Sequence, residues 1–136
     1  MNADMRVSEK KTFDVGGLSF TVLHRELGEK YGADGGVSIE IYGDVDGEKI
    51  QVLRFDCFRK QPHYHMPPSA PGQLSLDPKE VGTGLDWSFD QIREHLPEMI
   101  QTAGFTELAK TVDRYELHAK AVEQVQTAIS QTANSI

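Results

Sequence analysis

Apolar and polar residues alternate over residues 12–24 and 37–58, and the period becomes helical after residue 86. Residues 12–24 hold two alternating runs on either side of Gly16 and Gly17, a pair that can supply the positive φ angles of a two-residue hairpin turn. Residues 37–58 hold two longer runs joined by a turn that ends in Asp46 and Gly47. The first half of the chain therefore predicts an antiparallel β-sheet built from two hairpins.

The alternation also predicts which side chains of the second hairpin share a face. Counted by twos across the turn, one face is apolar and contains Val37, Ile39, Ile41, Ile50 and Val52. The same count places Arg54 and Asp56 on that face and Cys57 on the other. Since an unpaired buried charge is strongly unfavourable, Arg54 and Asp56 are expected either to pair structurally or to line a pocket.

A helical period begins near Trp87 and continues to the end of the chain. One helix is expected over residues 88–103, with Ser88 as its N-cap and a kink or a division at Pro97. A second is expected over residues 106–132, with heptad-spaced apolar residues that are Leu108, Val112, Tyr115, Ala119, Val122 and Ile129. Strands followed by a C-terminal helical pair predict an α+β fold.

The length of 136 residues fits a single domain over residues 1–136. Residues 1–11 are polar and are expected to be flexible, and the polar tail at 133–136 is expected to fray. Residues 61–86 are rich in proline and glycine and are expected to form a long loop.

Composition and charge argue against several classes of function. Fourteen Lys and Arg against 21 Asp and Glu give a formal net charge of -7, which opposes binding to nucleic acid or to an anionic membrane. The one cysteine cannot form an intramolecular disulfide, and no stretch resembles a signal peptide or a membrane span, so a cytoplasmic protein is expected. The sequence also lacks a G-x-S-x-G elbow, a phosphate loop and a dinucleotide fingerprint.

Residues 54–68 concentrate the side chains that could carry chemistry, and they are locally basic within an acidic chain. We interpret them as a pocket at the end of the sheet for a small anionic ligand, formed by Arg54, Asp56, Arg59, His63 and His65. On this interpretation the protein is a binding or interaction protein rather than an enzyme.

His63 and His65 support an alternative function, because the i, i+2 spacing in an extended segment places both imidazoles on one side. The alternative is a metal-binding protein or a metal-dependent enzyme, with a divalent metal as its cofactor. A third ligand would have to come from Asp56, Asp77, Asp86 or His95. The other interpretation is that the two histidines are loop residues whose only role is to form hydrogen bonds within the fold.

Cys57 is the remaining candidate for chemistry. A nucleophilic cysteine needs a lowered pKa and an adjacent base, whereas the alternation turns Cys57 toward the core and away from Asp56. An inert buried thiol is therefore expected.

The helix expected over 106–132 is longer than its predicted partner, so its last turns would expose apolar residues. A homodimer through Ala119, Val122 and Ile129 is expected to cover them.

Overall fold

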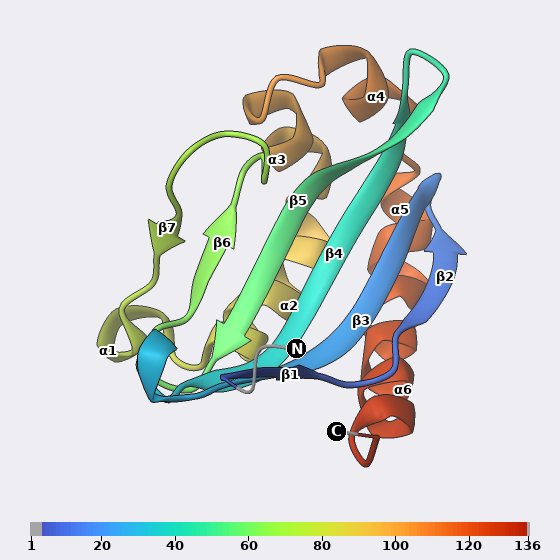
Figure 1. Ribbon diagram of the computed structural model, residues 1–136. Coiled ribbons are helices and arrows are strands. Elements are labelled where there is room, and N and C mark those ends of the chain that lie inside the picture. The colour runs from blue at the N-terminus through green and yellow to red at the C-terminus, as the bar shows by residue number, and fades with distance from the viewer. Residues whose placement is uncertain (1–3, 136) are drawn as a thin grey trace.

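The computed structural model describes residues 4–135, and its strands form one antiparallel sheet (Figure 1). The strands are β1 (Met5–Val7), β2 (Lys11–Val15), β3 (Leu18–Leu27), β4 (Gly35–Val45), β5 (Glu48–Phe58), β6 (His63–His65) and β7 (Leu74–Ser75). Their order in the sheet is β1-β3-β4-β5-β6-β7, and β2 also pairs with β3. A short 3-10 turn, η1 (Glu29–Tyr31), lies between β3 and β4.

The helices follow the strands in sequence and lie behind the sheet and at one end of it, so the other face of the sheet has no helix over it (Figure 1). They are α1 (Pro78–Val81), α2 (Gly84–Glu94), α3 (Leu96–Thr102), α4 (Thr106–Thr111), α5 (Arg114–Glu116), the π-helical turn η2 (Leu117–Ala121) and α6 (Val122–Thr132). The predicted α+β fold is confirmed. None of the helices described between residues 4 and 135 is long and apolar enough to cross a membrane.

Both predicted hairpins form with the expected turn chemistry. In the first, Val15 pairs with Leu18, and the turn residues Gly16 and Gly17 have φ angles of 64° and 84°. A side chain at Gly16 would also collide with Leu117, because its Cβ would lie 2.6 Å from the Leu117 Cγ. Glycine here allows both the tight turn and the close contact with the helical layer.

A β-bulge interrupts the second hairpin. Ile41 pairs with Leu53, but the next residue, Tyr42, pairs with Gln51, so Val52 is an extra residue on β5. From the bulge onward, the side chains of β5 point to the opposite face from the one that counting by twos predicts.

The bulge corrects the predicted faces of β5. Leu53 and Phe55 point into the apolar core. Arg54 and Asp56 point to the face of the sheet that has no helix over it, which we call the open face. The prediction that Arg54 and Asp56 share the apolar face of Val37, Ile39 and Ile41 was therefore wrong. The alternation that separates Cys57 from Asp56 is confirmed, since the Cys57 thiol contacts Ser88 of α2.

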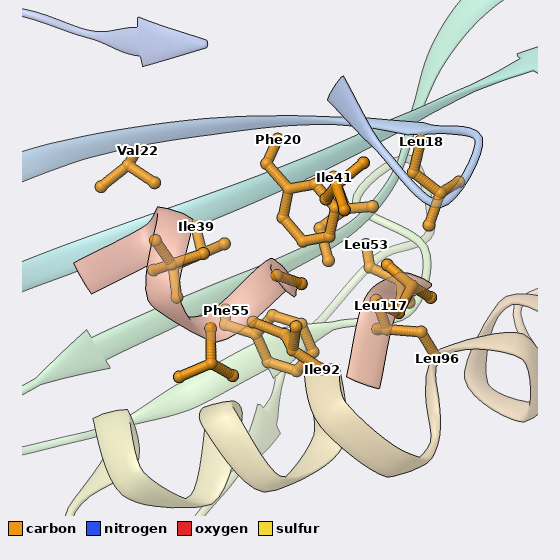
Figure 2. Close-up of a cluster of buried hydrophobic side chains, with 14 of the residues drawn as sticks. Leu18, Phe20, Val22, Ile39, Ile41, Leu53, Phe55, Ile92, Leu96 and Leu117 are labelled. Atoms are coloured by element: carbon orange, nitrogen blue, oxygen red, sulfur yellow. The ribbon is translucent and has the colours of Figure 1, made fainter. Parts of the chain in front are cut away.

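The hydrophobic core lies between the sheet and the helices (Figure 2). The residues drawn and labelled there are at most 2% exposed, and they are Leu18, Phe20, Val22, Ile39, Ile41, Leu53, Phe55, Ile92, Leu96 and Leu117. Full burial of such a side chain contributes roughly 1.5–3 kcal/mol. This layer holds β4 and β5 in place and thereby fixes the positions of the polar side chains on their other face.

The predicted division at Pro97 is confirmed, but α2 begins earlier than expected. His95 leaves the helical conformation between α2 and α3, and Pro97 lies in the first turn of α3. The N-cap of α2 is Thr83, whose hydroxyl accepts from the Asp86 N–H at 3.1 Å. Ser88 is instead buried inside the helix, where its hydroxyl donates to the Gly84 carbonyl.

The continuous helix predicted over 106–132 was wrong, because Val112 is extended and a new helix begins after Asp113. The Asp113 carboxylate accepts from the backbone N–H groups of Tyr115 and Glu116 and caps that helix. The interruption changes the helical phase, so Tyr115 is 86% exposed while Leu117 is buried.

Two segments expected to be irregular contain regular structure. Residues 5–7 of the expected flexible segment 1–11 form β1 and pair with β3, while residues 1–3 lie outside the described residues. The expected loop 61–86 contains β6, β7 and α1. Of the tail expected to fray, residues 133–135 follow α6, and residue 136 lies outside the described residues.

Candidate functional site

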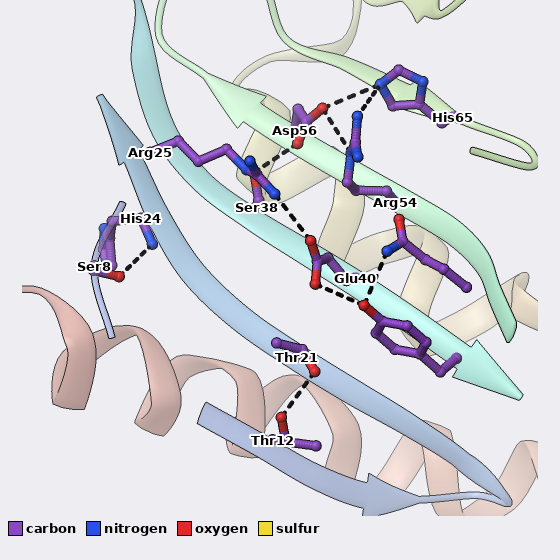
Figure 3. A network of polar contacts seen from close by, with 12 residues as sticks. Ser8, Thr12, Thr21, His24, Arg25, Ser38, Glu40, Arg54, Asp56 and His65 are labelled. Carbon is purple, nitrogen blue, oxygen red and sulfur yellow. Dashed lines mark hydrogen bonds and ion pairs between the residues drawn. The ribbon is translucent and has the colours of Figure 1, made fainter. Parts of the chain in front are cut away.

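The pairing of β5 with β6 brings together residues that the sequence separates. Asp56 lies opposite His63, and Arg54 lies opposite His65. Because side chains two residues apart share a face of a strand, all four lie side by side on the open face. Figure 3 shows Arg54, Asp56 and His65 on this face, connected to polar residues of β4.

One oxygen of Asp56 is the centre of the cluster. Its Oδ2 lies 2.9 Å from His63 Nε2 and 3.2 Å from His65 Nε2, and it accepts a hydrogen bond from Arg54 Nε at 3.2 Å. The other oxygen, Oδ1, accepts from the Ser38 hydroxyl at 2.6 Å. Asp56 is therefore oriented by β4 and presents a single oxygen to the two imidazoles.

Asp56 is charged although its side chain is only 4% exposed. Burial raises the pKa of its carboxyl, but hydrogen bonds from His63 and Ser38 and the charge of Arg54 outweigh burial and lower the pKa well below 3.8. The centre of the cluster is thus a carboxylate at neutral pH.

The contacts of His63 determine which of its nitrogens carries a proton. Nδ1 lies 3.0 Å from the Gln61 carbonyl oxygen, which can only accept, so Nδ1 carries a hydrogen. In the neutral ring, Nε2 therefore presents a lone pair toward Asp56. Burial lowers the pKa of His63, but the hydrogen bond with Asp56 outweighs it and the pKa lies above 6.5, since a second proton on Nε2 can be donated to the carboxylate.

His65 has the opposite electrostatic environment. Its Nε2 lies 3.0 Å from Arg54 Nη2, and because a guanidinium can only donate, Nε2 acts as the acceptor. Burial and the charge of Arg54 lower the pKa of His65, so the ring is neutral. His65 Nε2 and Asp56 Oδ2 are thus two neighbouring acceptors, and Arg54 donates a hydrogen bond to each of them.

Asp56, His63 and His65 could hold a metal ion, because one ligand atom from each lies within 4.8 Å of the others. Of the four third ligands considered from the sequence, the structure places Asp56 beside the histidine pair. Asp77 instead caps α1, and Asp86 and His95 are exposed at α2. Two imidazoles and one carboxylate are a donor set that suits divalent transition metals.

Arg59 is not brought to this cluster. Its guanidinium makes two hydrogen bonds to Glu26, at 3.0 and 3.1 Å, and its side chain is 60% exposed. It lines a different pocket of about 490 Å³, together with Cys57 and Pro62. Of the five residues predicted to form one pocket, four converge and Arg59 lies apart.

The Cys57 thiol is unsuited to nucleophilic chemistry. Burial raises its pKa to about 12, and its sulfur lies 3.4 Å from the Ser88 hydroxyl. A thiol with such a pKa contains almost no thiolate at neutral pH.

The residues expected at a dimer interface differ in their burial. Val122 lies in the core, Ile129 packs against the core, and Ala119 is exposed. They do not form one exposed stripe. The homodimer itself stays a prediction.

Sequence reasoning missed the polar residues that extend the cluster across the sheet. Arg25 donates to Ser38 at 3.0 Å and forms an ion pair with Glu40, whose other oxygen accepts from Tyr42 (Figure 3). The sequence feature that could have indicated them is the alternation of Ser38, Glu40 and Tyr42 with isoleucines on β4. This alternation pointed to the site only after the bulge was known, because the bulge places Asp56 on the same face as these polar residues.

A family model described as "Domain of unknown function (DUF7700)" matches residues 12–129. The chain belongs to this family. No match is found among curated proteins or among solved structures. The matched range of the DUF7700 domain includes Asp56, His63 and His65, so the candidate site lies inside the family's domain.

Proposed function

We propose that this protein binds one divalent transition metal ion through Asp56 Oδ2, His63 Nε2 and His65 Nε2, with Zn²⁺ as the first ion to test. The observation that carries the proposal is the direction of the three lone pairs. The Gln61 carbonyl fixes the hydrogen of His63 on Nδ1, and the Arg54 guanidinium makes Nε2 of His65 an acceptor. When His63 is neutral, both imidazoles therefore present lone pairs to the same carboxylate oxygen.

The groups around the three ligands also support a metal site. Metal-binding histidines usually donate their other N–H to a carbonyl or a carboxylate, as His63 does to Gln61. Ser38 holds the second oxygen of Asp56, which favours coordination through one oxygen only. Such outer partners fix ring and carboxylate orientation and raise metal affinity.

Three ligands from one sheet face occupy one side of an ion. Asp56 comes from β5, and both histidines come from β6. Zn²⁺ with three protein ligands keeps a further position for water or an exogenous ligand, and Fe²⁺ sites with two histidines and one carboxylate behave similarly. The side chains of His63 and His65 are 10% and 13% exposed, and that of Arg54 beside them is 28% exposed.

Two positive charges compete with the ion. In the metal-free protein, Asp56 is neutralised by Arg54 and by the proton that His63 gains. An ion must displace that proton and repel Arg54, whose side chain is 28% exposed and can turn toward solvent. We therefore expect metal affinity to fall as the pH is lowered and His63 becomes protonated.

A purely structural polar cluster is the main alternative, because Arg54 donates both to Asp56 Oδ2 and to His65 Nε2 and so satisfies both acceptors. The metal site is favoured over it because two imidazole nitrogens lie 2.9 and 3.2 Å from the same carboxylate oxygen. A pocket that binds an anion without a metal is supported less well, because Arg59 is paired with Glu26 elsewhere.

Isothermal titration of chelator-treated protein with Zn²⁺ tests the proposal. We expect one ion per chain and a rise in melting temperature, since an ion at 100 times its Kd stabilises the folded state by about 2.7 kcal/mol. His63→Ala and His65→Ala should each weaken binding by more than about 100-fold.

The matched control is His118→Ala. His118 Nδ1 lies 3.0 Å from Glu94 Oε1, so this pair reproduces one histidine–carboxylate contact of the site but lacks the second histidine. Its removal should leave the Zn²⁺ affinity unchanged. Absence of stoichiometric binding to the unmodified protein, or an equal loss in the control, would overturn the proposal.

A further inference from the structure

We infer that the metal-loaded site binds a small oxyanion, a carboxylate or a phosphate, with one oxygen on the ion and another on the guanidinium of Arg54. This inference rests on the proposed metal site and adds the chemical class of its ligand. It follows from the position of Arg54, the charge of the loaded site and the partners that Arg54 has.

Arg54 is close enough to share a ligand with the ion. Its Nη2 lies 3.0 Å from His65 Nε2, and an ion would lie about 2.1 Å from the same nitrogen. In the metal-free position of Arg54, its Nη2 therefore lies within about 5 Å of the place that the ion would occupy. An oxyanion can span this separation with two of its own oxygens.

The loaded site carries more positive than negative charge. A divalent ion and Arg54 supply three positive charges, whereas Asp56 supplies one negative charge and the neutral imidazoles supply none. The neighbouring pair of Arg25 and Glu40 adds no net charge. In a chain whose formal net charge is -7, this is a local cationic site that attracts a small anion.

Arg54, rather than Arg25, is the group that becomes available. Arg25 is bound to Ser38 and Glu40, neither of which is a proposed ligand. Arg54 instead forms its hydrogen bonds with Asp56 Oδ2 and His65 Nε2, and both of these atoms are proposed ligands of the ion. Loading the site thus removes the partners of Arg54 and leaves its planar set of donors to a carboxylate or phosphate.

Visible absorption of the Co²⁺-loaded protein tests this inference, because the spectrum responds to a ligand that joins the ion. Acetate and inorganic phosphate are titrated separately. A saturable spectral change with either anion is expected, and the two titrations identify which oxyanion class the site prefers.

Three variants assign the response to Arg54. Arg54→Met should weaken anion binding by at least about tenfold and leave Co²⁺ affinity unchanged or higher, since a competing cation is removed. Arg54→Lys keeps the charge and should give an intermediate anion affinity. Arg59→Met should have no effect, because Arg59 is paired with Glu26.

The outcomes separate the two proposals. If Co²⁺ and Zn²⁺ fail to bind the unmodified protein, the metal site is wrong and this inference falls with it. If the ions bind at one per chain but neither anion changes the spectrum, only this inference is overturned. The same holds if Arg54→Met binds the anions as tightly as the unmodified protein.

Discussion

Asp34 and Asp56 are both buried carboxylates with lowered pKa values, but different kinds of donor hold them. Asp34 accepts hydrogen bonds from three backbone N–H groups, those of Gly35, Lys60 and Gln61, at 2.8 to 2.9 Å. The donors of Asp56 are side chains: a serine, an arginine and a protonated histidine.

The difference in donors separates a structural carboxylate from the one that we propose as a metal ligand. Burial raises the pKa of Asp34, and the backbone donors outweigh it and lower the pKa below 3.8. Those donors cannot leave without unfolding the start of β4 and the segment that joins β5 to β6. The donors of Asp56 can rotate away or lose a proton, so its oxygen can change partners while the fold stays intact. Burial and pKa alone would not have distinguished the two.

The largest effect on stability is expected from Asp34→Ala. It leaves three backbone N–H groups without their acceptor, and each unsatisfied buried donor costs about 1–3 kcal/mol. After partial rehydration we expect the free energy of unfolding to fall by about 3 kcal/mol in urea titrations. Zn²⁺ affinity of the folded fraction should be retained. A stable variant that has lost Zn²⁺ binding would reverse the roles of the two carboxylates.

A smaller effect on stability, with complete loss of function, is expected from Asp56→Asn. The amide keeps a carbonyl acceptor for Ser38 but removes the charge that faces Arg54 and His63. We expect the metal-free protein to lose about 2 kcal/mol, since charged hydrogen bonds contribute about 1.5–3 kcal/mol each and Arg54 can reach solvent. Calorimetry should detect no Zn²⁺ binding. Binding at the original affinity would remove Asp56 from the ligand set.

The pH dependence of stability should distinguish the two carboxylates through His63, at pH values above 6.5. Both have lowered pKa values, so both stabilise the fold above pH 3.8 and lose that contribution as the pH falls. His63 has a raised pKa, so its contribution is present below pH 6.5 and is lost as the pH rises through the folded-state value. His65 has a lowered pKa and the opposite sign, so His65→Gln is used as the background.

In that background, metal-free protein should lose stability as the pH rises above 6.5 and through the raised folded-state pKa of His63. Adding Asp56→Asn should flatten this slope, because His63 then has no carboxylate partner. Adding Asp34→Asn should leave it in place. Urea midpoints measured across the pH series check this, and equal slopes in the two double variants would contradict the assignment.

The smallest effect is expected from Arg59→Met. Its ion pair with Glu26 is solvent-exposed, and such pairs contribute at most about 1 kcal/mol. We expect a change within about 0.5 kcal/mol in the urea experiment and no change in Zn²⁺ affinity. A large loss would mean that the end of β5 depends on this pair as well as on Asp34.

Both hairpins were predictable from their turn residues. Between two alternating runs, a Gly-Gly or Asp-Gly pair is typical of a tight hairpin turn, and these residues do adopt positive φ angles at Gly16, Gly17, Asp46 and Gly47. The bulge at Val52 could not be predicted, because a β-branched apolar residue fits a regular strand equally well. The choice of Asp56 as third ligand also required the register of β5 against β6, which no local pattern reveals.

The break before α5, by contrast, had a readable signal. Asp113 followed three residues later by Glu116 has capping-box spacing, and the heptad pattern across it obscured the new start. Glu116 accepts from the Gly16 N–H in the first hairpin turn, a contact between distant segments that the sequence does not show.

Because Val52 is an extra residue in β5, the number of residues in this strand determines which side chains reach the open face. A DUF7700 relative shortened by one residue at that point would turn Arg54 and Asp56 toward the helices and two core side chains toward solvent. Such a chain could keep its fold only by exchanging charged for apolar residues along the rest of β5. A one-residue deletion there would therefore erase the site as thoroughly as replacing its ligands.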